Sequence, residues 1–160
     1  LGDVDTRQRY ARPGPDRFKP TTGSEDGPVK LQFFLSYRNP RAAAVQQMID
    51  EIEQKHPGRV QVTYRNFPVT RAAFDKILED WDEGETTLTM AKAAEAAGDL
   101  GGLEAFMAIH RFNLQNQTSW SIDKLRAHAS RIGLDPDALV AQMETPEIEA
   151  AILAEGNWLM

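Results

Sequence analysis

The stretch of residues 29–45, VKLQFFLSYRNPRAAAV, decides the fold of this chain. Its first part places apolar side chains at every second position, and Phe34 makes the other face apolar as well, which is typical of a strand buried on both sides. Its second part begins a helix, because Asn39 is a favoured N-cap residue and Pro40 suits the first helical position. The stretch therefore predicts a strand that runs directly into a helix, with a polar residue at the junction.

The helix and the segment after it complete a βαβ unit. The helix is predicted to run from Pro40 to Lys55, and the sequence HPG at 56–58 ends it. Apolar and polar residues then alternate along RVQVTYRNF, residues 59–67, as in a second strand. Short joints favour a right-handed crossover, so we expect the two strands to be parallel. The buried stripe of the helix is predicted to consist of Val45, Met48, Ile49 and Ile52.

After Pro68 the sequence indicates helices only, separated by short polar turns. An Ala-rich helix is predicted to end at Gly98, and the next one, residues 103–114, carries His110 in step with its apolar residues. We predict a compact helical bundle over residues 70–155. The first apolar stripe of this bundle consists of Phe74, Ile77, Leu78 and Trp81, and the expected caps of its last three helices are Ser121, Asp135 and Thr145.

Residues 1–28 show neither helical nor alternating periodicity. They combine basic residues with several Pro and Gly residues, which is typical of an extended, irregular arm or linker that buries no core of its own. Two interpretations stay open at this point. The segment is a tether to something upstream, or it wraps around a partner protein with Tyr10 and Phe18 as anchors.

The composition excludes several classes of function. With 41% hydrophobic and 26% charged residues, the chain is typical of a soluble globular protein of one domain. Its net charge of −6 argues against nucleic-acid binding, which needs a basic surface. No segment approaches the roughly 20 apolar residues that cross a bilayer. The chain has no cysteine, and its histidines, at positions 56, 110 and 128, lack the spacing of a metal site. We therefore predict no metal and no cofactor.

The segment FFLSYRNPRAAAV, residues 33–45, resembles the active-site region of DsbA-like thioredoxin-fold proteins. Members of that family carry a pattern similar to F-x-x-Y-x-C-P-x-C here, and Phe34, Ser36 and Tyr37 are in register with it. Segments at 62–69, 93–117 and 125–143 are similar to other parts of the family. The resemblance implies an α/β fold: a thioredoxin-like βαβ unit at residues 29–69, followed by an all-helical insertion at residues 70–155.

The resemblance also implies that the reactive positions of the family are replaced. The two cysteines of the pattern fall on Asn39 and Ala42, with Pro40 and Arg41 between them. In the family, the helix N-terminus lowers the pKa of the first cysteine and the second cysteine resolves the mixed disulfide. An amide and a methyl group do neither. The chain is thus expected to be a degenerate member without catalytic residues at this place and without thiol–disulfide exchange.

Members of the family continue after the helical insertion with a last β-hairpin, and this chain reaches GNWLM, residues 156–160, where the hairpin would begin. We expect the chain to continue past Met160; otherwise a partner supplies the missing strands, or the helices cover the sheet edge. The family is largely extracytoplasmic, and the chain begins with Leu1 rather than Met. A periplasmic location is therefore predicted, with a removed signal or an upstream membrane anchor.

Two functions stay in competition on sequence grounds. The first is a redox-inactive structural or protein-interaction subunit of a larger assembly. The sequence does not distinguish this function from that of a chaperone that binds unfolded chains. The second is a cysteine-independent small-ligand binder, transferase or isomerase, since some relatives of this scaffold use glutathione-type ligands and a serine. The ligand would then bind at a helix N-terminus, which attracts anions. Its candidate contacts are Ser36, Tyr37, Asn39 and Arg41.

Overall fold

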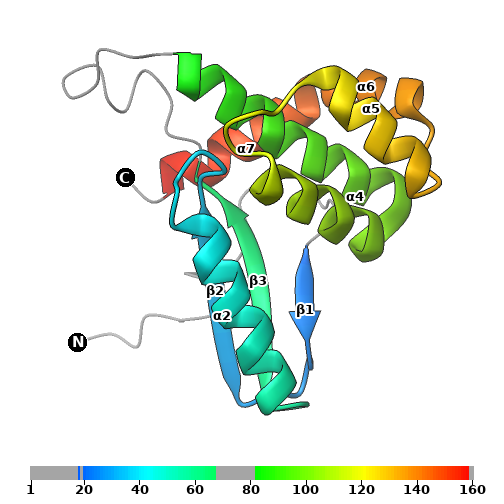
Figure 1. Cartoon of the computed structure of the whole chain (residues 1–160). Coiled ribbons are helices and arrows are strands. Elements are labelled where there is room, and N and C mark those ends of the chain that lie inside the picture. The colour runs from blue at the N-terminus through cyan, green and yellow to red at the C-terminus, as the bar shows by residue number, and fades with distance from the viewer. Residues whose placement is uncertain (1–17, 19, 68–81, 159–160) are drawn as a thin grey trace.

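The computed structural model of this protein describes Phe18 and residues 20–67 and 82–158. Figure 1 shows a small sheet with one helix, α2 (Ala42–Lys55), lying across it, and the helices of the second half of the chain gathered beside one end of the sheet. The fold is therefore mixed α/β, with a βαβ unit followed by helices, as the sequence predicts.

The sheet is built around the predicted parallel pair. Strand β2 (Val29–Leu35) pairs with strand β3 (Val60–Asn66) in parallel, in a register that runs from Val29 opposite Val60 to Leu35 opposite Asn66. Helix α2 connects them. The alternation of apolar residues in both strands and the short joints were thus sufficient to predict this unit.

A third strand lies inside the segment that the sequence analysis treats as irregular. Strand β1 (Thr21–Gly23) pairs antiparallel with β3, so that the order across the sheet is β1-β3-β2. The prediction of an arm without regular structure is wrong for these residues, because three residues are too few to show an alternation. A Cβ on Gly23 would lie 2.1 Å from the carbonyl oxygen of Val60, and its φ is 77°, so only glycine fits there.

The buried face of α2 differs from the predicted stripe. Ile49 is buried, but Val45 and Met48 are 37% and 61% exposed, and the side chains that turn inward with Ile49 are those of Ala42 and Gln46. The helix is rotated in this way because the polar side chain of Gln46 finds hydrogen-bond partners in the interior. Periodicity of apolar residues alone does not detect a buried glutamine.

The helical half consists of α4 (Asp82–Gln115), α5 (Ile122–Arg131), α6 (Pro136–Met143) and α7 (Pro146–Trp158). The predicted end at Gly98 is wrong, since α4 continues through it and is interrupted only at Gly102, with φ 70° and ψ −159°. The apolar stripe predicted for residues 74–81 lies outside the described residues.

The predicted helix caps are partly confirmed. Ser121 accepts a hydrogen bond from the backbone N–H of Lys124, and Asp135 accepts from those of Asp137 and Ala138. Thr145 instead donates its hydroxyl to the carbonyl oxygen of Gln142. Two of the three predicted caps therefore work as expected.

One hydrophobic core joins the two halves. The ring of Tyr64 in β3 lies 6.0 Å from those of Phe33 in β2 and Phe106 in α4. Phe18 packs against Phe106 from the N-terminal side, with ring centroids 5.8 Å apart. The sheet and the helical half therefore share their packing.

Candidate functional site

The turn between β2 and α2 is the place where the sequence predicts a site. Asn39 donates its backbone N–H to Ser36 O at 3.0 Å, and its side-chain Oδ1 accepts from the backbone N–H of Arg41 at 2.9 Å. The backbone N–H of Ala42 donates to Asn39 O at 3.0 Å, which makes a 3₁₀-type turn. The α-helix begins at Ala42, two residues later than predicted. Asn39 caps the turn that leads into the helix.

The two positions that correspond to reactive cysteines have different surroundings. Asn39 is exposed together with Pro40 and Arg41, whereas Ala42 is 4% exposed and belongs to the core. The side-chain oxygen of Asn39 is used as a backbone acceptor. Neither side chain carries a group that ionises or transfers electrons. The geometry of a helix start is thus retained without reactive chemistry at positions 39 and 42.

A residue beyond the end of α4 clamps this turn. Gln117 donates its side-chain amide to the carbonyl oxygens of Tyr37 at 2.6 Å and Asn39 at 2.7 Å. Arg38 in turn donates Nη1 to the carbonyl oxygen of Gln117. These reciprocal bonds fix the backbone of the turn against the helical half. Gln117 is the last residue of the segment 93–117 that resembles the family, and no role is predicted for it from the sequence.

Tyr37 points into the protein and away from the exposed side of the turn. It is 1% exposed, and its hydroxyl lies 2.9 Å from Nδ1 of His110. Burial raises the pKa of Tyr37 above its usual value, so the hydroxyl keeps its proton. Of the candidate contacts of a small ligand, Asn39 and Arg41 are exposed and Ser36 is partly buried, but Tyr37 does not share their surface.

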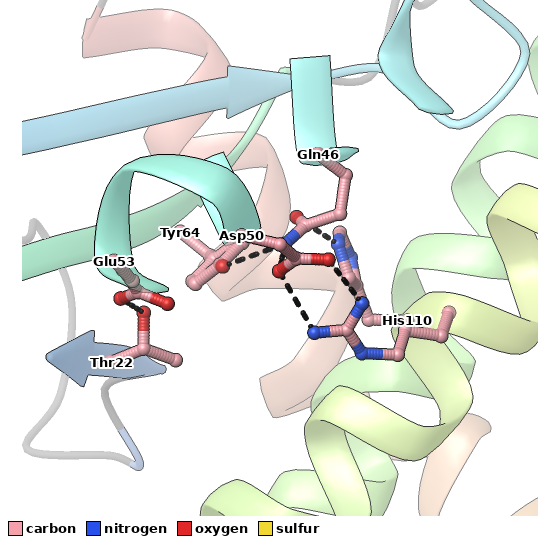
Figure 2. Close-up of polar contacts among 7 residues, drawn as sticks. Thr22, Gln46, Asp50, Glu53, Tyr64 and His110 are labelled. Atoms are coloured by element: carbon pink, nitrogen blue, oxygen red, sulfur yellow. Dashed lines mark hydrogen bonds and ion pairs between the residues drawn. The ribbon is translucent and has the colours of Figure 1, made fainter. Parts of the chain in front are cut away.

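A hydrogen-bonded chain continues from His110 to the surface, as Figure 2 shows. Nε2 of His110 lies 2.8 Å from Oε1 of Gln46. The amide nitrogen of Gln46 donates to Asp50 Oδ1 at 2.9 Å and to the hydroxyl of Tyr64 at 3.1 Å. Both carboxylate oxygens of Asp50 accept from Arg111, at 2.7 and 2.9 Å.

The direction of this chain determines the tautomer of His110. A carboxylate only accepts, so the nitrogen of the Gln46 amide must face Asp50 and its oxygen must face His110. Nε2 of His110 therefore carries the proton, and Nδ1 accepts from Tyr37. Burial lowers the pKa of His110 to about 3, so the ring is neutral near pH 7. The hydrogen bond from Arg111 lowers the pKa of Asp50 as well.

A second group of polar side chains is buried where β3 ends. Arg65, Asn66, Glu95 and Glu155 are each at most 3% exposed. Glu155 Oε1 lies 3.4 Å from Arg65 Nε, and its Oε2 accepts from the backbone N–H of Asn66 at 2.9 Å. The side-chain amide of Asn66 also donates to Glu95 at 2.8 Å. Buried charges of this kind need such partners. The group connects β3 to α4 and α7.

Tyr10 and Phe18 are the two residues predicted to anchor a partner, and the structure describes only the second of them. Tyr10 lies outside the described residues. Phe18 packs against the chain's own Phe106, and a Cβ added to Gly98 would lie 2.3 Å from its ring. The ring therefore has a packing role within the chain.

Sequence reasoning missed the importance of His110, Gln46 and Gln117. The signal for His110 was present, because it lies in step with Phe106 on the apolar face of its helix, and the structure finds it 0% exposed. No comparable signal marks the two glutamines. Their roles depend on contacts between segments that lie 64 and 80 residues apart in the sequence.

Comparisons with known proteins identify the fold. No model of a protein family matches the chain, and no curated protein sequence does. Among solved structures, the thiol-disulfide exchange protein alpha-DsbA2 from Wolbachia pipientis is similar with a TM-score of 0.68 and 22% identity, over 87% of this chain and 67% of that one. A thioredoxin-like oxidoreductase from Silicibacter pomeroyi has a TM-score of 0.62 and 24% identity, over 86% and 69% of the two chains.

A further similar structure is the catalytic domain of Proteus mirabilis ScsC, with a TM-score of 0.66 and 16% identity, over 88% of this chain and 68% of that domain. This chain thus spans about two thirds of the length of each of the three. The likeness confirms the predicted class: the fold is a DsbA-like thioredoxin fold with a helical insertion. Identities of this size concern the fold alone.

None of the helices within the described residues combines the length and the apolar character that crossing a bilayer would require.

Proposed function

We propose that this chain is a redox-inactive domain of the DsbA-like fold that serves as a structural or protein-interaction subunit of a larger, extracytoplasmic assembly. The observation that carries the proposal is the state of the helix start at β2–α2. Asn39 caps the turn and Ala42 packs into the core, while the chain contains no cysteine. Because the scaffold keeps its folded geometry without its reactive groups, the use that remains for it is the recognition of other molecules at its surface.

The first test concerns redox chemistry. The hydrogen bond from Ala42 N–H to Asn39 O holds the two Cα atoms within about 7 Å of each other, which is compatible with a disulfide. The double variant Asn39→Cys/Ala42→Cys is expected to form an intramolecular disulfide that exchanges with glutathione, as mass spectrometry would show. The double variant Asn39→Ser/Ala42→Ser is the matched control. Turnover of disulfide substrates by the unchanged chain would contradict the proposal.

The second test concerns partners and location. Affinity purification of the full chain from native extracytoplasmic fractions should recover a stoichiometric complex. We expect the residues before β1 to contribute to this complex, and Tyr10→Ser is the suitable variant, because Phe18 also has a packing role inside the chain. Recovery of the chain alone, or its presence only in the cytoplasmic fraction, would contradict the proposal.

The alternative of a small-ligand binder receives less support. Tyr37, one of its candidate contacts, is engaged with His110 in the interior. Oδ1 of Asn39 already accepts from the backbone. A thermal-shift measurement with glutathione separates the two functions, since a ligand bound at Asn39 and Arg41 would raise the melting temperature and a subunit role predicts no shift.

A further inference from the structure

Phe18 holds the N-terminal segment, by which we mean Phe18 and residues 20–23, against the helical half. A Cβ added to Gly98 would lie 2.3 and 2.5 Å from two carbons of the Phe18 ring, so the ring rests directly on the backbone of α4. Its centroid lies 5.8 Å from that of Phe106, which is buried. Phe18 therefore contacts two parts of α4, one before and one after the break at Gly102.

A row of ring contacts leads from Phe18 to the turn between β2 and α2. Phe106 stacks on His110, with ring centroids 5.8 Å apart and an angle of 12° between the ring planes. The ring of His110 meets that of Tyr37 edge-on at 5.6 Å and accepts the hydrogen bond of its hydroxyl at 2.9 Å. These three side chains are at most 1% exposed. Because a close-packed interior transmits displacements, we expect a shift of the Phe106 ring to reach Tyr37 through His110.

The turn is held to the rest of the molecule from two sides. On the inner side it is held by the Tyr37 side chain, and on the outer side Gln117 donates to the carbonyl oxygens of Tyr37 and Asn39. Within the turn, Asn39 N–H donates to Ser36 O, and Ala42 N–H donates to Asn39 O. If Tyr37 moves, the inner contact weakens, and the backbone of the turn depends more strongly on Gln117.

The N-terminal segment is expected to detach more easily than the rest of the described sheet. Strand β1 has three residues and lies at the edge of this sheet, where it pairs with β3. Short elements with few buried contacts open locally at a smaller free-energy cost than the whole domain. The segment can therefore adopt two states, one with Phe18 in contact with α4 and one with Phe18 released.

We propose that the contact of Phe18 with α4 controls the order of the turn at residues 36–42. While the contact is made, Phe106 supports the rings that hold Tyr37, and the backbone of the turn is fixed. When Phe18 is released, this support is lost and the turn loosens on its exposed side.

This coupling gives the proposed function a means of regulation, and it rests on that function for one step. A partner that binds the residues before β1 and draws Phe18 away from α4 would loosen the turn. By linkage, a partner that orders the turn would favour the attached segment. The coupling itself is a property of the isolated chain. Its failure would leave the proposed subunit role standing, and failure to recover a complex would leave the coupling standing.

The first experiment compares the backbone amide signals of full-length variants by NMR. In Phe18→Ala the signals of Asn39 and Ala42 should move, and the order parameter of Asn39 should fall below the rigid value of about 0.85. Thr21→Val is the matched control, because it removes a hydroxyl contact to Thr63 from the same segment and leaves Phe18 in place. The two signals should move at least about threefold further in Phe18→Ala than in this control.

The second experiment releases Phe18 without replacing it. Gly98→Ala places a methyl group where the Phe18 ring lies, so it should move the signals of Asn39 and Ala42 in the same direction. Added to Phe18→Ala, it should cause no further displacement, because the ring that it would expel is already absent. This variant also provides the test if Phe18→Ala does not fold.

Three outcomes would overturn the proposal. One is that the signals of the turn stay in place in both Phe18→Ala and Gly98→Ala. Another is an equal displacement in Phe18→Ala and Thr21→Val, which would show a general effect of loosening the segment. The third is a full further displacement when Gly98→Ala is added to Phe18→Ala, which would mean that Gly98 affects the turn by another route.

Discussion

At the scale of single residues, Asn39 and His110 represent two different kinds of constraint. Asn39 is exposed and uses one side-chain oxygen to cap a turn, a role that serine or aspartate could also fill. His110 is 0% exposed, and both of its ring nitrogens have partners. Substitution of Asn39 should therefore be tolerated, whereas substitution of His110 should disturb the hydrogen-bonded chain from Tyr37 to Asp50.

The buried histidine should make the stability of the protein depend on pH. The pKa of His110 falls from 6.5 to about 3 on folding, so between these values the unfolded chain binds a proton that the folded chain does not. The contribution of the neutral His110 ring to the free energy of unfolding is fully present above pH 6.5 and should be lost as the pH falls toward 3. The free energy of unfolding should therefore decrease over this range with a slope of up to about 1.4 kcal/mol per pH unit.

Chemical denaturation of His110→Gln at several pH values checks this expectation. The slope of its unfolding free energy against pH should be smaller than that of the unchanged chain, by the amount that corresponds to about one proton. His56→Gln is the matched control, because His56 is exposed after the end of α2. A smaller dependence of the unfolding free energy on pH should remain in every variant, since burial and Arg131 also lower the pKa of His128. Equal slopes in His110→Gln and His56→Gln would refute the role of His110.

At the scale of the elements, the docking of the N-terminal segment depends on a glycine in the middle of a helix. Gly98 lies within α4, where alanine would ordinarily stabilise the helix by about 0.5–1 kcal/mol. A Cβ at this position would lie 2.3 and 2.5 Å from two ring carbons of Phe18. We expect Gly98→Ala to displace Phe18 and to destabilise the protein by roughly 1–3 kcal/mol.

A double-mutant cycle isolates the cause. In the Phe18→Ala background the clash is removed, so Gly98→Ala should become neutral or stabilising, which thermal or chemical denaturation would detect. A destabilisation of the same size in both backgrounds would show that Phe18 is not the reason for the glycine.

The elements also show what could be predicted from the sequence. The strands β2 and β3, their parallel pairing and two of the helix caps follow from local patterns, because alternation and capping residues act over a few neighbours. The strand β1 and the rotation of α2 could not be predicted, since each depends on a distant segment. The start of a helical segment at residue 103 agrees with the break at Gly102, but the sequence did not show that the preceding segment continues through Gly98.

The candidate site shows the same limit. The resemblance to a known pattern located positions 39 and 42. Asn39, the predicted N-cap of the helix, instead caps the turn before it, and the N-cap of α2 is Arg41. The clamp by Gln117 and the inward direction of Tyr37 follow from long-range packing that no local pattern encodes.

At the scale of the whole molecule, the sheet and the helical half are held together by the buried polar group at the end of β3. Glu155 comes from α7, Arg65 and Asn66 from β3, and Glu95 from α4. Glu155 and Arg65 have side chains that are 0% and 1% exposed. Removal of one partner leaves the other charge buried, so Glu155→Ala should cost about 3–5 kcal/mol of unfolding free energy.

Hydrogen exchange distinguishes this role from a general loss of packing. Because Glu155 accepts the backbone N–H of Asn66, its removal should lower protection first at the end of β3 and in α7, and less at β1. Lys55→Ala is the matched control: Lys55 pairs with Glu51, both side chains are more than 50% exposed, and the loss should be below about 1 kcal/mol. If Glu155→Ala cost no more than Lys55→Ala, the two halves would have to be coupled by their other contacts, which are the apolar packing of Tyr64 and Phe106 and the hydrogen bonds of Gln117 and His110.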